Sequence, residues 1–142
     1  MTVRHVTVAP PAVRRHRRLA NRCVLAVLRS PLHALLDPGL CELRYHGRRS
    51  GRRYALPVMY ARTDGRLVVL VGDAPDKTWW RNFRHARPVT VRRAGVLRSG
   101  VARILRPGDE GYADNVQGYV KRHGLAPHPT DRLLVIDLSE GA

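Results

Sequence analysis

Residues 41–72, CELRYHGRRSGRRYALPVMYARTDGRLVVLVG, contain three short runs rich in β-branched and aromatic side chains, separated by two turns that contain glycine. The runs at 41–46, 53–62 and 66–72 have strand length, and the turns at 47–51 and 63–65 are short enough to join antiparallel neighbours. This stretch therefore predicts an antiparallel sheet and decides the fold class.

The same pattern returns later in the chain, where we predict further strands at 88–93, 96–105 and 132–138. Two helices, near 77–86 and 109–123, are expected to interrupt the series. About six strands with so few residues between them predict an α+β fold built on a small, closed or partly closed antiparallel barrel.

An amphipathic helix is predicted at residues 11–29, because its apolar side chains recur at helical spacing opposite a strongly basic face. Ser30 and Pro31 are expected to open a second short helix, which Pro38-Gly39 ends. The basic helix suits either an anionic membrane surface or one end of the barrel. The predicted apolar face consists of Val13, Leu19, Cys23, Val24, Val27 and Leu28.

Length and composition predict one soluble domain, with residues 1–39 as a helical segment and 40–142 as the barrel. The chain has 142 residues and is 44% apolar, but no apolar run approaches the roughly 18 residues that a spanning helix needs. Cys23 and Cys41 lack CxxC spacing and lie among apolar residues, so we expect two reduced thiols packed in the core. Since the basic N-terminus lacks a cleavage site of the A-x-A type, we expect a cytoplasmic protein.

The formal net charge of +15 predicts an anionic partner, which could be a nucleic acid, a lipid headgroup or a phosphorylated cofactor. The seven histidines are scattered without metal-ligand spacing, so no metal site is expected. Signatures of serine hydrolases, zinc proteases, P-loop proteins and dinucleotide-binding folds are missing as well.

The turn GRRSGRR, residues 47–53, is the first candidate binding element. A turn flanked by glycines can aim several backbone N–H groups at one point, and adjacent guanidinium and hydroxyl groups fit phosphate oxygens. The turn therefore predicts an anion site, although a solvated basic hairpin has the same composition.

The loop and helix GDAPDKTWWRNF, residues 72–83, is the second candidate element and contains both tryptophans of the chain. Adjacent side chains on a helix point about 100° apart, so one indole can pack in the core while the other faces a ligand. Such an indole would form a wall for a flat ring.

In their order and spacing, these segments resemble the deazaflavin-dependent nitroreductase family of split β-barrel oxidoreductases, which bind coenzyme F420. The resemblance runs from about Leu43 to Leu105, with looser similarity to Leu138, and its core is GRRSGRRYALPVMY, then GDAPDKTWWRNF and PVTV. It implies that the protein positions a cofactor that carries a hydride, while the acceptor is an electron-poor small molecule such as a quinone, an enone or a nitro compound.

The resemblance also implies roles for individual residues. The turn would hold the cofactor's phosphate and acidic tail, the strand ends would lie along its ring and ribityl chain, and the short helix would close the site. In this order, the implied cofactor-binding residues are Arg48, Arg49, Ser50 and Arg53, then Pro57, Val71, Gly72 and Asp73, then Lys77, Trp79 and Asn82. Tyr119 and His123, before the last strand, are the candidates for a proton donor.

Several alternatives stay open at this point. A related split barrel could bind FMN, haem or another tetrapyrrole, since basic turns suit a short phosphate as well as a long acidic tail. The protein could also be a binding or storage protein without catalysis. A nucleic-acid-binding module ranks lower, because only 6% of the residues are aromatic and the tyrosines are dispersed. A homodimer is compatible with the edges of such a barrel.

Overall fold

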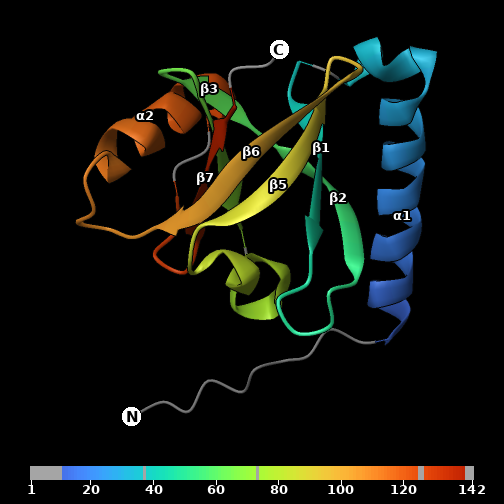
Figure 1. Ribbon diagram of the computed structural model, residues 1–142, viewed down its shortest axis with the longest axis horizontal. Coiled ribbons are helices and arrows are strands. Elements are labelled where there is room, and N and C mark those ends of the chain that lie inside the picture. The colour runs from blue at the N-terminus through green and yellow to red at the C-terminus, as the bar shows by residue number, and fades with distance from the viewer. Residues whose placement is uncertain (1–10, 37, 73, 125–126, 140–142) are drawn as a thin grey trace.

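The computed structural model describes residues 11–36, 38–72, 74–124 and 127–139 (Figure 1). Its seven strands form one antiparallel sheet with the order β2-β1-β5-β6-β7-β4-β3. The strands are β1 (Leu40–His46), β2 (Arg53–Met59), β3 (Ala61–Thr63), β4 (Arg66–Val71), β5 (Arg87–Arg93), β6 (Val96–Leu105) and β7 (Arg132–Leu138). The predicted α+β class is confirmed.

The number of strands corrects the prediction of about six, because the run at 53–62 forms two strands. Tyr60 alone separates β2 from β3, although these two strands are the opposite edges of the sheet. One residue advances the chain by only about 3.3 Å. The sheet must therefore curl until its edges approach each other, which produces a half-barrel.

Helix α1 (Pro11–Arg29) lies alongside β2 on the outside of the half-barrel (Figure 1). Among the side chains of α1 that are described, from residue 19 on, Leu25 and Leu28 are buried, whereas Leu19 is 58% exposed. Cys23 is exposed too, so the prediction that both cysteines pack in the core is wrong for Cys23 and correct for the buried Cys41. In the part of the chain that is described, no helix combines the length and the apolar character needed to cross a bilayer.

The short helices are 3-10 turns rather than α-helical turns. Ser30 caps η1 (Pro31–Leu35) as predicted, since its Oγ accepts a hydrogen bond from the N–H of Leu32 at 3.1 Å. In place of the helix predicted at 77–86, the structure has the five-residue 3-10 helix η3 (Trp79–Phe83), which follows the three-residue η2 (Ala74–Asp76). Within η3, Asn82 Nδ2 donates a hydrogen bond to the carbonyl oxygen of Trp79, three residues back, at 2.8 Å.

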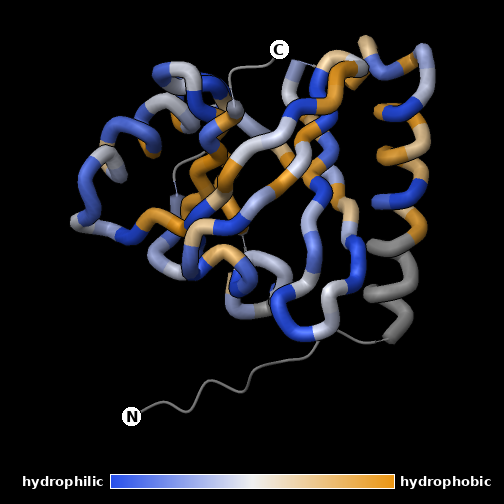
Figure 2. The backbone as a smooth tube through the Cα atoms, viewed as in Figure 1, coloured by the Kyte–Doolittle hydropathy of each residue, from blue (hydrophilic) through white to orange (hydrophobic). Residues whose placement is uncertain are grey.

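Two hydrophobic clusters stabilise the half-barrel. The larger one fills the inside of the curled sheet and includes Leu43, Val69, Phe83 and Ile136. The smaller one lies under α2 (Tyr112–His123), which packs against β3 and β4. Figure 2 shows this distribution, with hydrophobic residues along the central strands and hydrophilic residues along the turn between β1 and β2. That polar turn is where the candidate site begins.

Candidate functional site

The turn at residues 47–52 connects β1 to β2 and is closed by its own backbone. Gly47 donates its N–H to the carbonyl of Arg52 at 2.8 Å, and Gly51 donates to the carbonyl of Gly47 at 3.0 Å. Gly51 has a φ of +69°, which glycine adopts at little cost. With the backbone fixed in this way, the side chains of Arg48, Arg49 and Ser50 are left exposed.

Asn82 joins this turn to η3. Its side-chain oxygen Oδ1 accepts a hydrogen bond from the backbone N–H of Arg48 at 2.8 Å, while its Nδ2 donates to the carbonyl of Trp79. One amide side chain therefore uses both ends to hold two segments that are distant in the sequence. The turn and the short helix face the same space as a result.

That space is a cleft of about 540 Å³. Five of the residues that the sequence suggested as cofactor ligands line it, and five others that it did not suggest line it as well. The first five are Arg48, Arg49, Ser50, Trp79 and Asn82, and the second five are Tyr45, Gly47, Tyr54, Thr78 and Arg81.

The adjacent tryptophans have different environments, as helical geometry required. Trp80 is 6% exposed and donates its Nε1–H to the carbonyl of Ala74 at 2.7 Å. Trp79 is half-buried and lines the cleft, and its ring meets Phe83 edge-on at 6.4 Å between centroids. Trp79 therefore presents part of an indole to whatever occupies the cleft, while Trp80 anchors η3.

The remaining implied cofactor ligands lie elsewhere in the described structure. Val71 belongs to the inner core, Pro57 pairs with Glu42 in the β1–β2 ladder, and Arg53 lines a neighbouring groove. Gly72 and Lys77 follow β4 and are partly exposed. None of these five lines the cleft, and Asp73 falls outside the described residues. Their binding roles stay predictions.

The two candidate proton donors lie on α2, well separated from the turn in Figure 1. Tyr119 is 3% exposed, and burial raises the pKa of its hydroxyl. Its ring lies 4.6 Å from that of His123, whose Nε2 is 2.7 Å from the carbonyl oxygen of Tyr60. These contacts fix α2 against the barrel, and the catalytic roles of both residues stay predictions.

Sequence reasoning missed several residues of this region. Tyr45 and Tyr54 pair across β1 and β2 and stack at 5.5 Å with an interplanar angle of 23°, forming one wall of the cleft. Arg81 adds a third guanidinium to the lining. The available signals were Tyr54 just after the basic turn and Arg81 beside Trp79 and Asn82 on one short helix.

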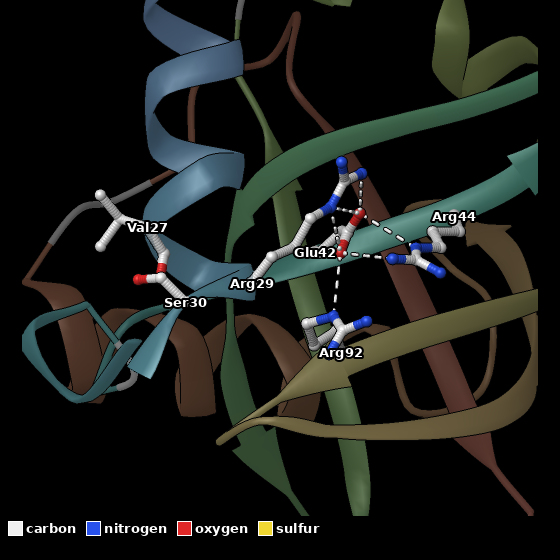
Figure 3. A network of polar contacts seen from close by, with 6 residues as sticks. All are labelled: Val27, Arg29, Ser30, Glu42, Arg44 and Arg92. Carbon is white, nitrogen blue, oxygen red and sulfur yellow. Dashed lines mark hydrogen bonds and ion pairs between the residues drawn. The ribbon is translucent and has the colours of Figure 1, made fainter. Parts of the chain in front are cut away.

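A buried carboxylate was also missed. Glu42 of β1 is fully buried and accepts hydrogen bonds from Arg29, Arg44 and Arg92, on three different elements (Figure 3). Burial alone would raise the pKa of Glu42, but the hydrogen bonds from Arg29 and Arg44 outweigh it and hold the pKa below its ordinary value. This cluster attaches the end of α1 to the sheet.

Comparisons with known proteins bear on the fold. No protein-family model matches the chain, and no curated protein matches it in sequence. Among solved structures, an F420-H2 dependent reductase (FDR-A) superposes with a TM-score of 0.59 at 17% identity, over 71% of this chain and 96% of that chain. The fold of that reductase agrees with the resemblance seen in the sequence.

Two further solved structures have similar folds. HutZ, described as a haem storage protein from Vibrio cholerae, has a TM-score of 0.58 at 13% identity, over 82% of this chain and 89% of that chain. A chain described as a domain-swapped dimer has a TM-score of 0.50 at 14% identity, over 89% of this chain and 99% of that chain. At these identities the likeness concerns the fold alone.

Proposed function

We propose that this protein is an F420-dependent oxidoreductase, which holds the cofactor in the cleft and passes a hydride to an electron-poor quinone, enone or nitro compound. The observation that carries the proposal is the hydrogen bond between Arg48 and Asn82, because it brings the basic turn and the indole of Trp79 to one cleft.

The donor set of the cleft fits the two ends of such a cofactor. Arg48 and Arg49 can bind phosphate oxygens through paired N–H groups, and the Ser50 hydroxyl adds one more donor. Trp79 provides an apolar face of the size that a flat ring needs. FMN has a phosphate and a planar ring too, so it is the first alternative cofactor.

When bound, a reduced deazaflavin supplies the hydride, and the residues of this chain supply position. Orientation of two reactants can contribute roughly 7–11 kcal/mol toward the barrier. The two hydrogen bonds of Asn82 serve this purpose, since they fix the turn that would bind the tail relative to the indole of Trp79. Tyr119 and His123 remain the proposed proton donors. The variants Tyr119→Phe and His123→Gln test these roles.

The experiment is a titration of the purified protein with F420 and, separately, with FMN, followed through the fluorescence of the ring. Arg48→Ala and Arg49→Ala should each weaken binding of the preferred cofactor about tenfold, because each removes a charge-assisted hydrogen bond. The control is Arg62→Ala, an exposed arginine on β3 that does not line the cleft. If all three variants bind equally well, the tail does not lie at the turn.

A steady-state assay with reduced F420 and menadione distinguishes an enzyme from a binding or storage protein. Oxidation of F420 that requires both the protein and menadione supports the reductase.

Haem binding is the second alternative, favoured by the fold that this chain shares with HutZ. A haem titration that produces a sharp absorbance band, without any F420 or FMN binding, would replace the reductase proposal.

We also propose a homodimer, because a chain described as a domain-swapped dimer has a similar fold. Light scattering during size-exclusion chromatography measures the mass directly and would contradict the dimer if it gave about 16.0 kDa.

Cytoplasmic location and contact with a membrane surface stay predictions. A salt-dependent shift with oligonucleotides, in the absence of cofactor binding, would favour the nucleic-acid alternative.

A further inference from the structure

A second hollow, a groove of about 510 Å³, lies where the end of α1 meets strands β1, β2, β5 and β6. It shares only Tyr45 and Tyr54 with the cleft and is lined by a different set of arginines, Arg29, Arg44 and Arg53. Its volume falls within the range of about 300–1,000 Å³ that is usual for small-molecule sites. Apart from these two tyrosines and Arg53, whose cofactor role is a prediction, the lining of the groove has no part in the proposed function, so the groove is a second candidate site beside the cleft.

The charge around the groove is unbalanced. Glu42 lies buried beside it as the only carboxylate of its cluster, while Arg29, Arg44 and Arg92 bring three positive charges, which leaves a surplus of two. Arg53 adds a further positive charge at the rim, and no acidic residue occurs among the described residues that line the groove. An anion placed here would reduce the repulsion between these guanidinium groups.

Glu42 also fixes the arginines in place. Arg29 donates to its carboxylate through Nε at 3.0 Å and through Nη2, and Arg44 donates through Nε at 3.0 Å and Nη2 at 3.2 Å (Figure 3). A guanidinium carries five N–H donors, so each group keeps donors beyond those that Glu42 engages. Much of the entropy cost of ordering these side chains is therefore met before any ligand arrives.

The rest of the lining is uncharged and partly apolar. Tyr54 and Pro88 provide apolar surface, and Thr90 and Ser99 provide hydroxyl groups. We propose that the groove binds a small amphipathic carboxylate, with its head on Arg29 and Arg44 and its apolar body along Tyr54 and Pro88. A carboxylate suits these groups because a guanidinium can bind it through two parallel hydrogen bonds.

The probe is decanoate, with decanol as the uncharged analogue of the same chain length. Binding is followed by calorimetry and by amide shifts in an NMR spectrum of the full chain. We expect decanoate to shift the amides of Thr90, Ser99 and Gly100 while those of Arg48 and Ser50 stay in place. Decanol should bind about tenfold more weakly or not at all, because a hydrogen bond to a charged group is lost.

Two variants test the site by different routes. Ser99→Trp fills the groove without changing any charge and should abolish decanoate binding, and Arg44→Gln should weaken it about tenfold. Arg62→Gln removes one positive charge elsewhere and should leave binding unchanged. The dispersion of each NMR spectrum shows whether the variant is folded, and Ser99→Trp decides the matter if Arg44→Gln fails to fold.

Several results would overturn the proposal. One is no decanoate binding at all, including the case in which a second copy covers the face and light scattering shows a dimer. Others are equal binding of decanol, or shifts that centre on Arg48 and Ser50 and persist in Ser99→Trp. Binding that responds to Arg62→Gln as strongly as to Arg44→Gln would show a general charge effect and would overturn it too.

Discussion

The backbone N–H of Arg48 donates a hydrogen bond to the side-chain oxygen of Asn82 over 2.8 Å, across 34 positions of sequence. The bond is made by backbone on one side, so it does not depend on which side chain occupies position 48. The guanidinium of Arg48 takes no part in this bond and is exposed at the cleft. Asn82 thus holds the turn and η3 together beside the cleft.

Asn82→Ala should therefore separate the turn from η3. We expect a loss of about 1 kcal/mol in the free energy of unfolding and a weaker affinity for the cofactor, because both hydrogen bonds of the amide disappear. Urea unfolding and the fluorescence titration measure the two effects. Asn82→Asp keeps an acceptor for the N–H of Arg48, so it should retain more affinity for the cofactor than Asn82→Ala. Equal cofactor affinities of the two variants would contradict a role of this hydrogen bond in binding.

The sequence predicted the strands and the turn at residues 47–51 more readily than the way in which they combine. Alternation of side chains and turn glycines is local, which is why β1, β5, β6 and β7 lie close to their predicted positions. The break at Tyr60 depends on the curling of the whole sheet, which no local pattern contains. The same holds for Pro57, whose neighbour Glu42 is known only once the β1–β2 register is known.

Glu42→Gln should be among the most destabilising polar substitutions in this chain. Glutamine keeps one acceptor oxygen, but its amide NH2 replaces the other and faces the guanidinium groups, so charge-assisted hydrogen bonds to a buried group are lost at a cost of about 3 kcal/mol. The matched control is Asp137→Asn, which breaks the ion pair with Arg66 between two half-exposed side chains and should cost less than about 1 kcal/mol.

Urea unfolding of both variants at pH 7 measures the difference. Equal losses for Glu42→Gln and Asp137→Asn would show that burial of the Glu42 cluster contributes nothing of its own.

Acid should remove the contribution of Glu42 selectively. Its pKa is lower in the folded chain than its ordinary value of 4.5, since the hydrogen bonds from Arg29 and Arg44 outweigh burial. A carboxylate with a depressed pKa stabilises the fold fully above the unfolded value, and this stabilisation is lost as the pH falls through the folded pKa. The gap in unfolding free energy between wild type and Glu42→Gln should stay constant above about pH 5.5 and shrink below it. A gap that is unchanged down to pH 3 would contradict this assignment.

The two cysteines should differ sharply in reactivity. Cys41 is fully buried, and burial raises the pKa of its thiol to about 12, so it presents little thiolate near neutral pH. Cys23 is exposed on α1. Ellman's reagent at pH 8 should therefore label one thiol in the native protein and the second only in denaturant. Native Cys23→Ser should show no fast labelling; a fast reaction in that variant would mean that β1 opens readily.

The Glu42 cluster shows why the arginine-lined groove could not be predicted. A single acidic residue in CELRYH looks like an ordinary exposed strand position, and its three arginines come from α1, β1 and β5. Their meeting depends on α1 lying alongside the sheet and on the β1–β5 register. Tyr45 and Tyr54 raise the same difficulty, since only the β1–β2 register reveals their stacking.

Gly118 in α2 should not tolerate a side chain as long as Thr63 of β3 lies opposite it. A Cβ at this position would overlap Thr63 Oγ1 and lie 3.2 Å from Thr63 Cβ. Alanine improves helix propensity by about 1 kcal/mol, whereas overpacking costs typically 1–3 kcal/mol, so Gly118→Ala should lower the free energy of unfolding.

Thr63 Oγ1 is buried and lacks a partner among the described residues, so Thr63→Ala should cost little and make room for the new methyl group. The double variant should then be at least as stable as wild type, as measured by urea unfolding in a double-mutant cycle. Additive effects of the two substitutions would show that α2 does not pack on β3 at this point.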